Sequence, residues 1–266
     1  MKPFLKWAGG KYRLAGRIRA ILPAGLRLIE PFVGSGAVFL NVDYDAYLLA
    51  DINADLMGMY QTLQTHGVKF IAHCRTFFTP ENNTSERYYA LRDEFNATKN
   101  PWRKSALFLY LNRHGYNGLV RYNSCGRYNV PFGRYTRPYF PEREMEYFAA
   151  HAQRATFLCA DFRTIMDQAR PGDVVYCDPP YVPLSATANF TGYAASGFTL
   201  NDQQDLVNLV KALVRRGIPV LVSNHDTEET ARLYANATLV EHFNVQRNIS
   251  CSSGSRGPAN EVLALF

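Results

Sequence analysis

The residues best suited to chemistry form one short motif, Val174–Tyr181 (VVYCDPPY). Its apolar run predicts a strand that delivers Asp178 to its carboxyl end, where ligands bind in parallel α/β sheets. The two prolines remove backbone N–H donors and fix φ, so the nearby carbonyls are held rigidly. Asp178 and the Pro179 carbonyl can each accept one N–H of an exocyclic amine, while Tyr181 stacks on the attached ring. The motif predicts a receptor for a planar amine; the alternative is a simple Pro-Pro strand terminator.

A glycine turn, Pro31–Gly36 (PFVGSG), follows the apolar run Leu26–Phe32. Glycines allow a sharp turn and a close approach of backbone to a ligand. Asp51 ends the next apolar run, where a carboxylate can accept hydrogen bonds from ribose hydroxyls. The third glycine that a dinucleotide's pyrophosphate needs is missing, so the pattern predicts a nucleoside ligand without phosphate. An ordinary βα turn is the alternative.

The N-terminal segment Phe4–Lys11 (FLKWAGGK) has the Gly-Gly-Lys of a P-loop but fails that motif. Leu5 stands where glycine is needed, and Tyr12 replaces the Ser/Thr that binds magnesium. Lys11 can still reach a ligand carboxylate, and Trp7 can cover a ligand with its ring. A flexible N-terminus is the alternative.

The elements that position these motifs alternate between strands and helices, which predicts a parallel α/β sheet. Strands are expected at 26–32, 47–50, 155–160, 173–177, 218–223 and 261–266, and helices from residue 37 and over 202–215. The alternation stops after Asn53, where helices are expected at 55–65, 86–96 and 101–113, followed by a Gly/Asn/Pro/Tyr-rich hairpin region at 115–139. We therefore expect a Rossmann-like domain (1–54 and 144–266) with an inserted, mainly helical subdomain (55–143).

The positive charge is concentrated in the insertion. The chain has 266 residues and a net charge of +6, and Lys99–Arg143 alone contains nine basic residues against one acid, Glu142. Tyrosines and asparagines are interleaved with the arginines, a mixture typical of nucleic-acid surfaces. A solvated charged face is the alternative.

Composition excludes several classes of protein. Apolar residues make up 47% and charged residues 20% of the chain, which predicts a packed globular core. No apolar run approaches the ~18 residues of a membrane span, and the N-terminus lacks the apolar stretch of a signal peptide. Five scattered cysteines without a Cys-x-x-Cys pair argue against a zinc ribbon or a disulfide framework. We expect a soluble cytoplasmic protein without a metal ion or membrane contact.

Together the motifs carry a family resemblance over nearly the whole chain. The segments are FLKWAGGKY, EPFVGSGAVF, LFLYLNRHGYNGL with RYN, NVPFGRY with PYF, YCDPPY with PLSATANFT, and SNHD. In this order they resemble the Dam family of DNA adenine-N6 methyltransferases, which modify GATC. The chain departs from the family at its C-terminus, where Arg256–Asn260 is less basic and no lysine-rich tail follows.

The resemblance implies a methyl donor, S-adenosyl-L-methionine (AdoMet), which becomes S-adenosyl-L-homocysteine. The implied cofactor residues are Trp7, Lys11, Phe32, Gly34, Gly36, Asp51, Asp161, Phe162 and Asp178. The implied catalytic residues are Asp178, Pro179, Pro180 and Tyr181. Double-stranded DNA is the implied partner, and a monomer is the default state.

The implied DNA-binding residues are Lys6, Tyr116, Asn117, Leu119, Arg121, Pro131, Arg134 and Tyr135. Arg121 and Lys6 would each contact a guanine, and Leu119 with Pro131 a thymine methyl. Tyr116 and Asn117 would fill the gap left by a flipped adenine, and Arg134 and Tyr135 would lie on the DNA backbone or base edges. The segment Ser185–Thr191 would close over the target.

Other functions remain open at this point. An RNA or cytosine-N4 methyltransferase would use the same logic, although Asp178 in place of serine favours adenine. A non-catalytic DNA-binding module would need only the basic insertion, and would leave the glycine turn and the Asp-Pro-Pro-Tyr motif unexplained.

Overall fold

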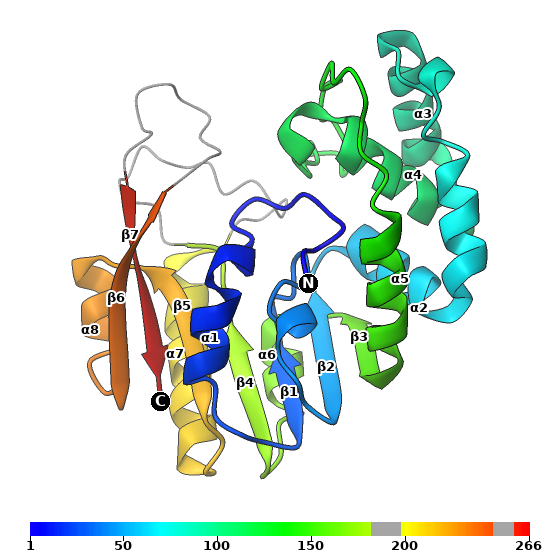
Figure 1. The fold of residues 1–266 in the computed structure, drawn as a ribbon. Coiled ribbons are helices and arrows are strands. Elements are labelled where there is room, and N and C mark those ends of the chain that lie inside the picture. Colours follow the sequence, from blue (N-terminus) through cyan, green and yellow to red (C-terminus); the bar gives the residue numbers. More distant parts are fainter. Residues whose placement is uncertain (182–197, 247–257) are drawn as a thin grey trace.

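The computed structural model describes residues 1–181, 198–246 and 258–266. The Ser185–Thr191 segment and the first residues of Arg256–Asn260 lie outside this described part. A twisted sheet with helices on both faces forms one half of the molecule, and a helical part stands beside it (Figure 1).

The described strands form a seven-stranded sheet in the order β3-β2-β1-β4-β5-β7-β6. They are β1 (Arg27–Glu30), β2 (Ala46–Asp51), β3 (Ala155–Cys159), β4 (Asp173–Cys177), β5 (Val220–His225), β6 (Leu239–Gln246) and β7 (Pro258–Leu265). The five neighbouring strands β3, β2, β1, β4 and β5 are parallel to one another. β7 lies between β5 and β6 and runs antiparallel to both. The order reverses direction at β1 and β4, which is the switch point where such sheets bind ligands.

β1, β2, β4 and β5 are buried on both faces, as their continuous apolar sequences predict. β3 lies at the edge of the sheet, and Thr156 and Cys159 on it are exposed. Leu28 packs into the core on the side of α1 (Ala15–Ile21), whereas Ile29 packs into the core on the other side. The other face is covered by α6 (Phe162–Met166), α7 (Leu200–Arg215) and α8 (Glu228–Leu233). The α/β prediction is confirmed.

The prediction of a helix after the glycine turn is wrong. Only a short 3-10 turn, η2 (Phe39–Asn41), lies between β1 and β2. The Asn41 side chain donates to the Ala37 carbonyl at 2.8 Å, and the chain then turns into β2. The aromatic ring of Phe39 fills the space over the sheet against Tyr47 and Phe148. The connection from β1 to β2 therefore covers the sheet without a helix longer than this turn.

The helical part occupies the chain between β2 and β3. It contains α2 (Ala54–Arg75), α3 (Ser85–Ala97), α4 (Pro101–His114) and α5 (Glu142–His151), with short 3-10 turns η3 (Pro80–Asn82), η4 (Tyr116–Gly118) and η5 (Ala152–Arg154). The side chains of Asn53, Thr84 and Asn100 cap α2, α3 and α4 by accepting backbone N–H bonds. The hairpin region is held by isolated bridges, Tyr122 with Tyr128 and Gly115 with Phe132, rather than by long strands.

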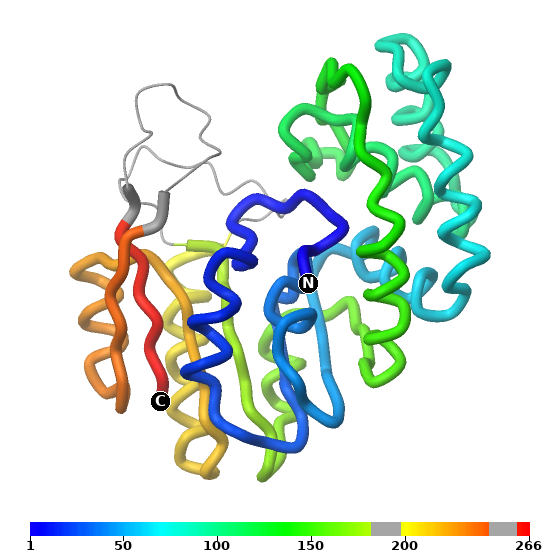
Figure 2. Tube along the Cα trace, viewed as in Figure 1, coloured from blue at the N-terminus to red at the C-terminus, as the bar shows by residue number. Residues whose placement is uncertain are grey.

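The first ten residues form an arch between the sheet and the helical part (Figure 2). Asn112 on α4 holds this arch, because its side chain accepts from Lys6 N at 2.9 Å and donates to Lys6 O at 2.7 Å. After the arch, η1 (Lys11–Leu14) leads into α1. α4 thereby fixes the part of the arch that carries Lys6 and Trp7; the Lys6 side chain lies on the Tyr135 ring, and Trp7 lines the cavity at the carboxyl edge of the sheet. Within the described residues, no helix is long and apolar enough to cross a membrane.

Candidate active site

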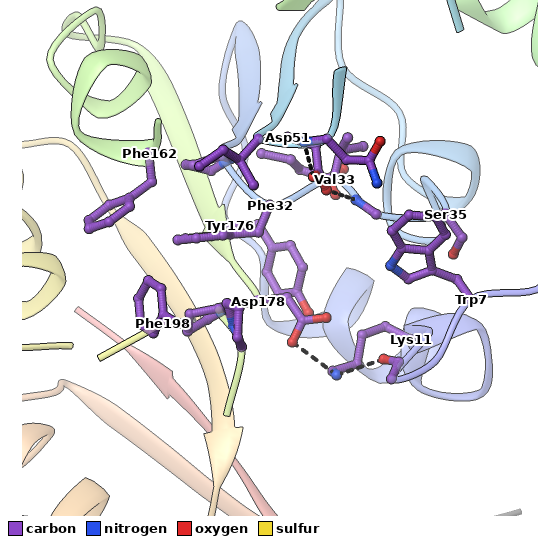
Figure 3. Close-up of a pocket in the computed structure, with 18 of the residues that line it drawn as sticks. Trp7, Lys11, Phe32, Val33, Ser35, Asp51, Phe162, Tyr176, Asp178 and Phe198 are labelled. Atoms are coloured by element: carbon purple, nitrogen blue, oxygen red, sulfur yellow. Dashed lines mark hydrogen bonds and ion pairs between the residues drawn. The ribbon is translucent and has the colours of Figure 1, made fainter. Parts of the chain in front are cut away.

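A cavity of about 360 Å³ opens at the carboxyl ends of β1, β2, β3 and β4 (Figure 3). Its lining includes the sequence-predicted residues Trp7, Lys11, Phe32, Gly34, Asp51, Asp161, Phe162, Asp178, Pro179, Pro180 and Tyr181. Gly36 is absent from the lining; its positive φ of 70° instead completes the turn. Residues more than 170 positions apart thus meet in one cavity.

Asp178 is held by two donors on the same oxygen. Lys11 Nζ lies 2.9 Å from Asp178 Oδ1, and Ser223 Oγ donates to that oxygen at 2.8 Å. Tyr176 in turn donates its hydroxyl to Ser223 Oγ at 3.2 Å. The carboxylate is therefore oriented, and among the described residues no hydrogen bond occupies Oδ2, which can accept from a ligand.

Tyr181 is positioned by the far strands of the sheet. Its hydroxyl donates to Glu261 Oε2 at 3.0 Å, and its ring meets the His225 ring edge-to-face at 4.2 Å. Glu261 on β7 and His225 on β5 are directly paired. Burial and the nearby Asp178 raise the pKa of Tyr181 well above its usual value, so the phenol stays protonated and keeps donating. Lys11 Nζ lies 4.6 Å from the Tyr181 ring centroid.

The glycine turn is fastened from three sides. Gly34 has a φ of 47°, and a Cβ there would lie only 2.9 Å from Trp7 Nε1, so glycine is required on both counts. Tyr60 on α2 donates its hydroxyl to the Gly34 carbonyl at 2.6 Å, and Gly34 N donates to Asp51 Oδ2 at 3.2 Å. The turn therefore presents rigid backbone to the cavity.

Asp51 ends β2 and also accepts from Asn53 N at 2.9 Å. Burial raises the pKa of Asp51 to about 6, against the opposing effect of these backbone donors. At neutral pH it is a half-buried carboxylate that lines the cavity.

An aromatic slot closes the other end of the cavity. Phe32 stacks on Phe162 at 5.3 Å and meets Phe198 edge-to-face at 5.8 Å. Asp161 lies beside this slot, where its side chain caps α6 and pairs with Arg163. A flat heterocycle is the ligand group that such a slot suits.

The lining is strongly acidic. Five acidic side chains and one basic side chain, Lys11, face the cavity: Glu30, Asp51, Asp161, Asp178 and Asp202. This charge balance suits a cationic ligand, and the volume suits a cofactor of drug-like size. Among the described residues, no group of three or more His, Cys, Asp or Glu is placed to hold a metal ion.

Several residues that the resemblance assigns to DNA lie together at the junction of the arch and the hairpin region. Lys6 Nζ lies 4.0 Å from the Tyr135 ring centroid, and Tyr135 Oη accepts from Asn117 N at 2.9 Å. Tyr116 N donates to the Pro131 carbonyl at 2.9 Å. Partial burial and the nearby Arg113 lower the pKa of Lys6 to about 8.

Arg121 lies exposed on the hairpin and is braced by Asn129. Its Nε donates to Asn129 Oδ1 at 2.7 Å and its Nη2 to the Asn129 carbonyl at 3.3 Å. The neighbouring Tyr122 anchors the hairpin by donating to Asp55 Oδ2 on α2 at 2.7 Å. Arg134 is exposed with a positive φ of 54°, whereas Leu119 is half-buried against the core.

Part of the basic stretch serves the fold instead of a ligand. Arg103 binds Glu94 through two nitrogens, Lys104 pairs with Asp55 at 3.1 Å, and Arg113 is buried beneath the arch. The net charge of this stretch therefore overstates the cationic surface available to DNA.

Sequence reasoning missed Ser223, Tyr176, Glu261, Tyr60, Phe198 and Glu30. Usable signals existed for Ser223, which ends a predicted strand next to the one carrying Asp178, and for Glu30, which directly precedes the glycine turn. The others act across elements that no local pattern connects.

We expect Ser223→Ala to lower kcat by roughly 10- to 100-fold, the value of one hydrogen bond to a charged group. The Asp178 carboxylate would lose one of its two orienting donors, while the KM for the methyl donor should change little. Tyr176→Phe, one bond further out, is the matched control and should cost less. Steady-state methylation kinetics would decide; an unchanged kcat in Ser223→Ala would show that the contact serves only the fold.

The fold and the site define a class. A seven-stranded sheet with an antiparallel β7, a glycine turn after β1, an acidic residue after β2 and Asp-Pro-Pro-Tyr after β4 describe an AdoMet-dependent methyltransferase that acts on an amino group.

Comparison with known proteins makes the class specific. The sequence profile of the D12 class N6 adenine-specific DNA methyltransferases matches residues 7–249. The chain is 54% identical over 266 residues to a DNA adenine methylase of Serratia marcescens, covering 100% of this chain and 98% of that protein. It is 51% identical to the DNA adenine methylases of Escherichia coli K12 and Vibrio cholerae, covering 100% of this chain and 95% and 96% of theirs.

The chain belongs to the D12 class of N6 adenine-specific DNA methyltransferases, and the enzymatic prediction is confirmed. The alternatives of a cytosine-N4 or RNA methyltransferase and of a non-catalytic DNA-binding module are thereby set aside.

Proposed function

We propose that this adenine-N6 methyltransferase acts on the adenine of GATC in double-stranded DNA, with AdoMet as donor, as a cytoplasmic monomer. Trp7, Lys11, Asp51 and the glycine turn would hold the methionine and ribose parts, and the aromatic slot the cofactor's adenine. When bound, AdoMet supplies an electrophilic methyl group. The domain division at residues 54 and 144 belongs to the same proposal, with 55–143 as the DNA-reading part.

The N6 lone pair of adenine is delocalised into the ring, so the amine is a poor nucleophile. In the proposed mechanism Asp178 Oδ2 and the Pro179 carbonyl each accept one hydrogen bond from the N6 amino group. These acceptors favour tetrahedral geometry at nitrogen and stabilise the positive charge that develops there. Lys11 and Ser223, both bound to Oδ1, keep the carboxylate oriented during the reaction.

In a duplex N6 is paired and stacked, so the target base must be flipped out at a cost of a few kcal/mol. Stacking on Tyr181 would offset part of that cost, and Tyr116 with Asn117 would occupy the vacated space. Arg121 and Lys6 would read the guanines, with Leu119 and Pro131 beside the thymine methyl. Arg134 and Tyr135 would lie along the DNA backbone or base edges.

The observation that carries the proposal is that Asp178, Pro179, Pro180 and Tyr181 line the same cavity, at the carboxyl edge of the sheet, as the glycine turn and Asp51. The test is methylation of unmethylated plasmid DNA by the purified protein with AdoMet. Nucleases that cut only methylated or only unmethylated GATC would report the product. Entry of tritiated methyl without any change in GATC cleavage would retain the chemistry and refute the target sequence.

The Asp51 carboxyl gives a pH dependence. Because its pKa is raised to about 6, the Asp51 carboxylate takes up a proton as the pH falls through that value. The protonated oxygen can then no longer accept a hydrogen bond from a ribose hydroxyl. We expect binding of 5′-methylthioadenosine, which keeps the ribose and adenine, to weaken below about pH 6. Calorimetric titration from pH 5 to 8 would measure this, and Asp51→Asn should bind more weakly with a flatter profile. An unchanged pH profile in Asp51→Asn would contradict the assignment.

A further inference from the structure

Tyr181 is tied to the far strands of the sheet by its hydroxyl group and by its ring. The hydroxyl donates to Glu261 Oε2 at 3.0 Å, and Glu261 is 7% exposed. The ring meets the His225 ring edge-to-face, with 4.2 Å between the two centroids. Two residues on two different strands therefore fix the orientation of this phenol.

The antiparallel direction of β7 brings Glu261 to this edge of the sheet. Parallel strands deliver only their carboxyl ends to the edge where the cavity lies, whereas a reversed strand delivers its first residues there. Glu261 is near the start of β7 and pairs with His225, the last residue of β5. Leu263, two residues further on, lies on the same face of the sheet and packs in the core. The pairing register of β5 and β7 thus places the carboxyl group beside Tyr181.

A tethered ring favours a base that stacks on it. Ordering a loose side chain when a ligand arrives costs affinity, and a ring that is already fixed avoids this cost. Burial raises the pKa of Tyr181 well above its usual value, so the phenol stays protonated and the bond to Glu261 is retained at neutral pH. Because the hydroxyl is engaged within the protein, Tyr181 offers a ligand the face of its ring.

We propose that Glu261 is a positioning residue for adenine methylation: its hydrogen bond with the Tyr181 hydroxyl holds the ring in the orientation in which the flipped adenine stacks on it. The proposal rests on the proposed function, which gives Tyr181 the stacking role, and adds to it a residue of β7. Glu261 acts through Tyr181, since it is absent from the described residues that line the cavity.

The test compares two hemimethylated GATC duplexes that differ only at the target. In one the unmethylated adenine is present, and in the other an abasic site replaces it. Their affinities are measured for wild type, Glu261→Met and Glu261→Gln with S-adenosyl-L-homocysteine, which prevents turnover. A general defect of the fold would weaken the binding of both duplexes. A loosened Tyr181 ring would weaken only the binding of the duplex that supplies a base to stack.

We expect Glu261→Met to bind the adenine duplex about 3- to 10-fold more weakly and the abasic duplex within about twofold of wild type. Its kcat should fall roughly 10- to 100-fold, since small misplacements at a reacting centre cost rate. Glu261→Gln keeps a carbonyl oxygen for the Tyr181 hydroxyl and should recover most of both losses. Glu229→Met, the same change at an exposed position on α8, is the matched control and should keep the wild-type values.

Three results would overturn the role of Glu261. They are an equal weakening of both duplexes by Glu261→Met, no weakening of either, and a Glu261→Gln variant no better than Glu261→Met. Tyr181→Phe alone must also weaken the adenine duplex more than the abasic one, because it removes the same hydrogen bond and keeps the ring. This last comparison keeps the proposal testable even if the Glu261 variants fail to fold.

A double-mutant cycle tests the route through Tyr181. If Glu261 acts through the shared hydrogen bond, Glu261→Met should lower kcat by only about twofold when Tyr181→Phe is already present. Additive losses would refute the proposal and leave the proposed function intact. Failure of wild type to methylate the adenine of GATC would instead refute the proposed function.

Discussion

Asp178→Asn should lower kcat for DNA methylation by about 10²- to 10³-fold or more, the usual cost of removing one preorganised partner of a developing charge. The substitution preserves size but replaces a charged acceptor with an amide that can present hydrogens to N6. It also leaves Lys11, which is 5% exposed, without its ionic partner. We therefore expect a lower Tm in addition to the lost activity.

The two effects can be separated. Near-UV circular dichroism and binding of 5′-methylthioadenosine report on the fold and on the nucleoside end of the cavity, and both should survive. Asp167→Asn, the same substitution at an exposed position after α6, is the matched control and should keep the wild-type rate. Retention of a near wild-type kcat by Asp178→Asn would remove Asp178 from the catalytic role.

Arg121→Ala should reduce discrimination at one guanine of the site by ~1–3 kcal/mol, roughly 5- to 150-fold in the ratio of kcat/KM values. The physical reason is the loss of a bidentate donor that Asn129 braces on the protein side and Tyr122 anchors through Asp55. The measurement compares GATC duplexes with duplexes in which one guanine is replaced.

Arg127→Ala provides the matched control on the same hairpin. Arg127 is exposed and lies 4.0 Å from Asp93. We expect Arg127→Ala to weaken the binding of all sequences about equally and to reduce the salt dependence of binding, as the loss of an exposed positive charge near the DNA backbone does. If Arg121→Ala behaved in the same way, Arg121 would be a phosphate contact, and the base-reading role would pass to another residue.

Much of the cavity was predictable because its parts are local. A strand followed by Gly34, or by Pro179 and Pro180, sets the backbone through torsional preferences that neighbours in sequence decide. Parallel strands then bring Asp51 and Asp178 to the same edge whatever the details of packing. The missing helix after Gly36 marks the limit of this reasoning, since the packing of Phe39 over the sheet decided that crossover.

The sequence by itself determined the α/β class, and it predicted a nucleoside-binding edge and an amine receptor, since each depends on short-range backbone chemistry. Only the tertiary structure decided the hydrogen-bond partners of those groups. Ser223, which binds Asp178, lies 45 residues from it in the sequence, and Glu261, which binds Tyr181, lies 80 residues from it. It also decided which basic residues serve the fold, as Arg113 does, and left Glu30 Oε1 buried without a hydrogen-bond partner among the described residues. Such pairings depend on strand order and on the desolvation that packing imposes, and no local spacing encodes either of them.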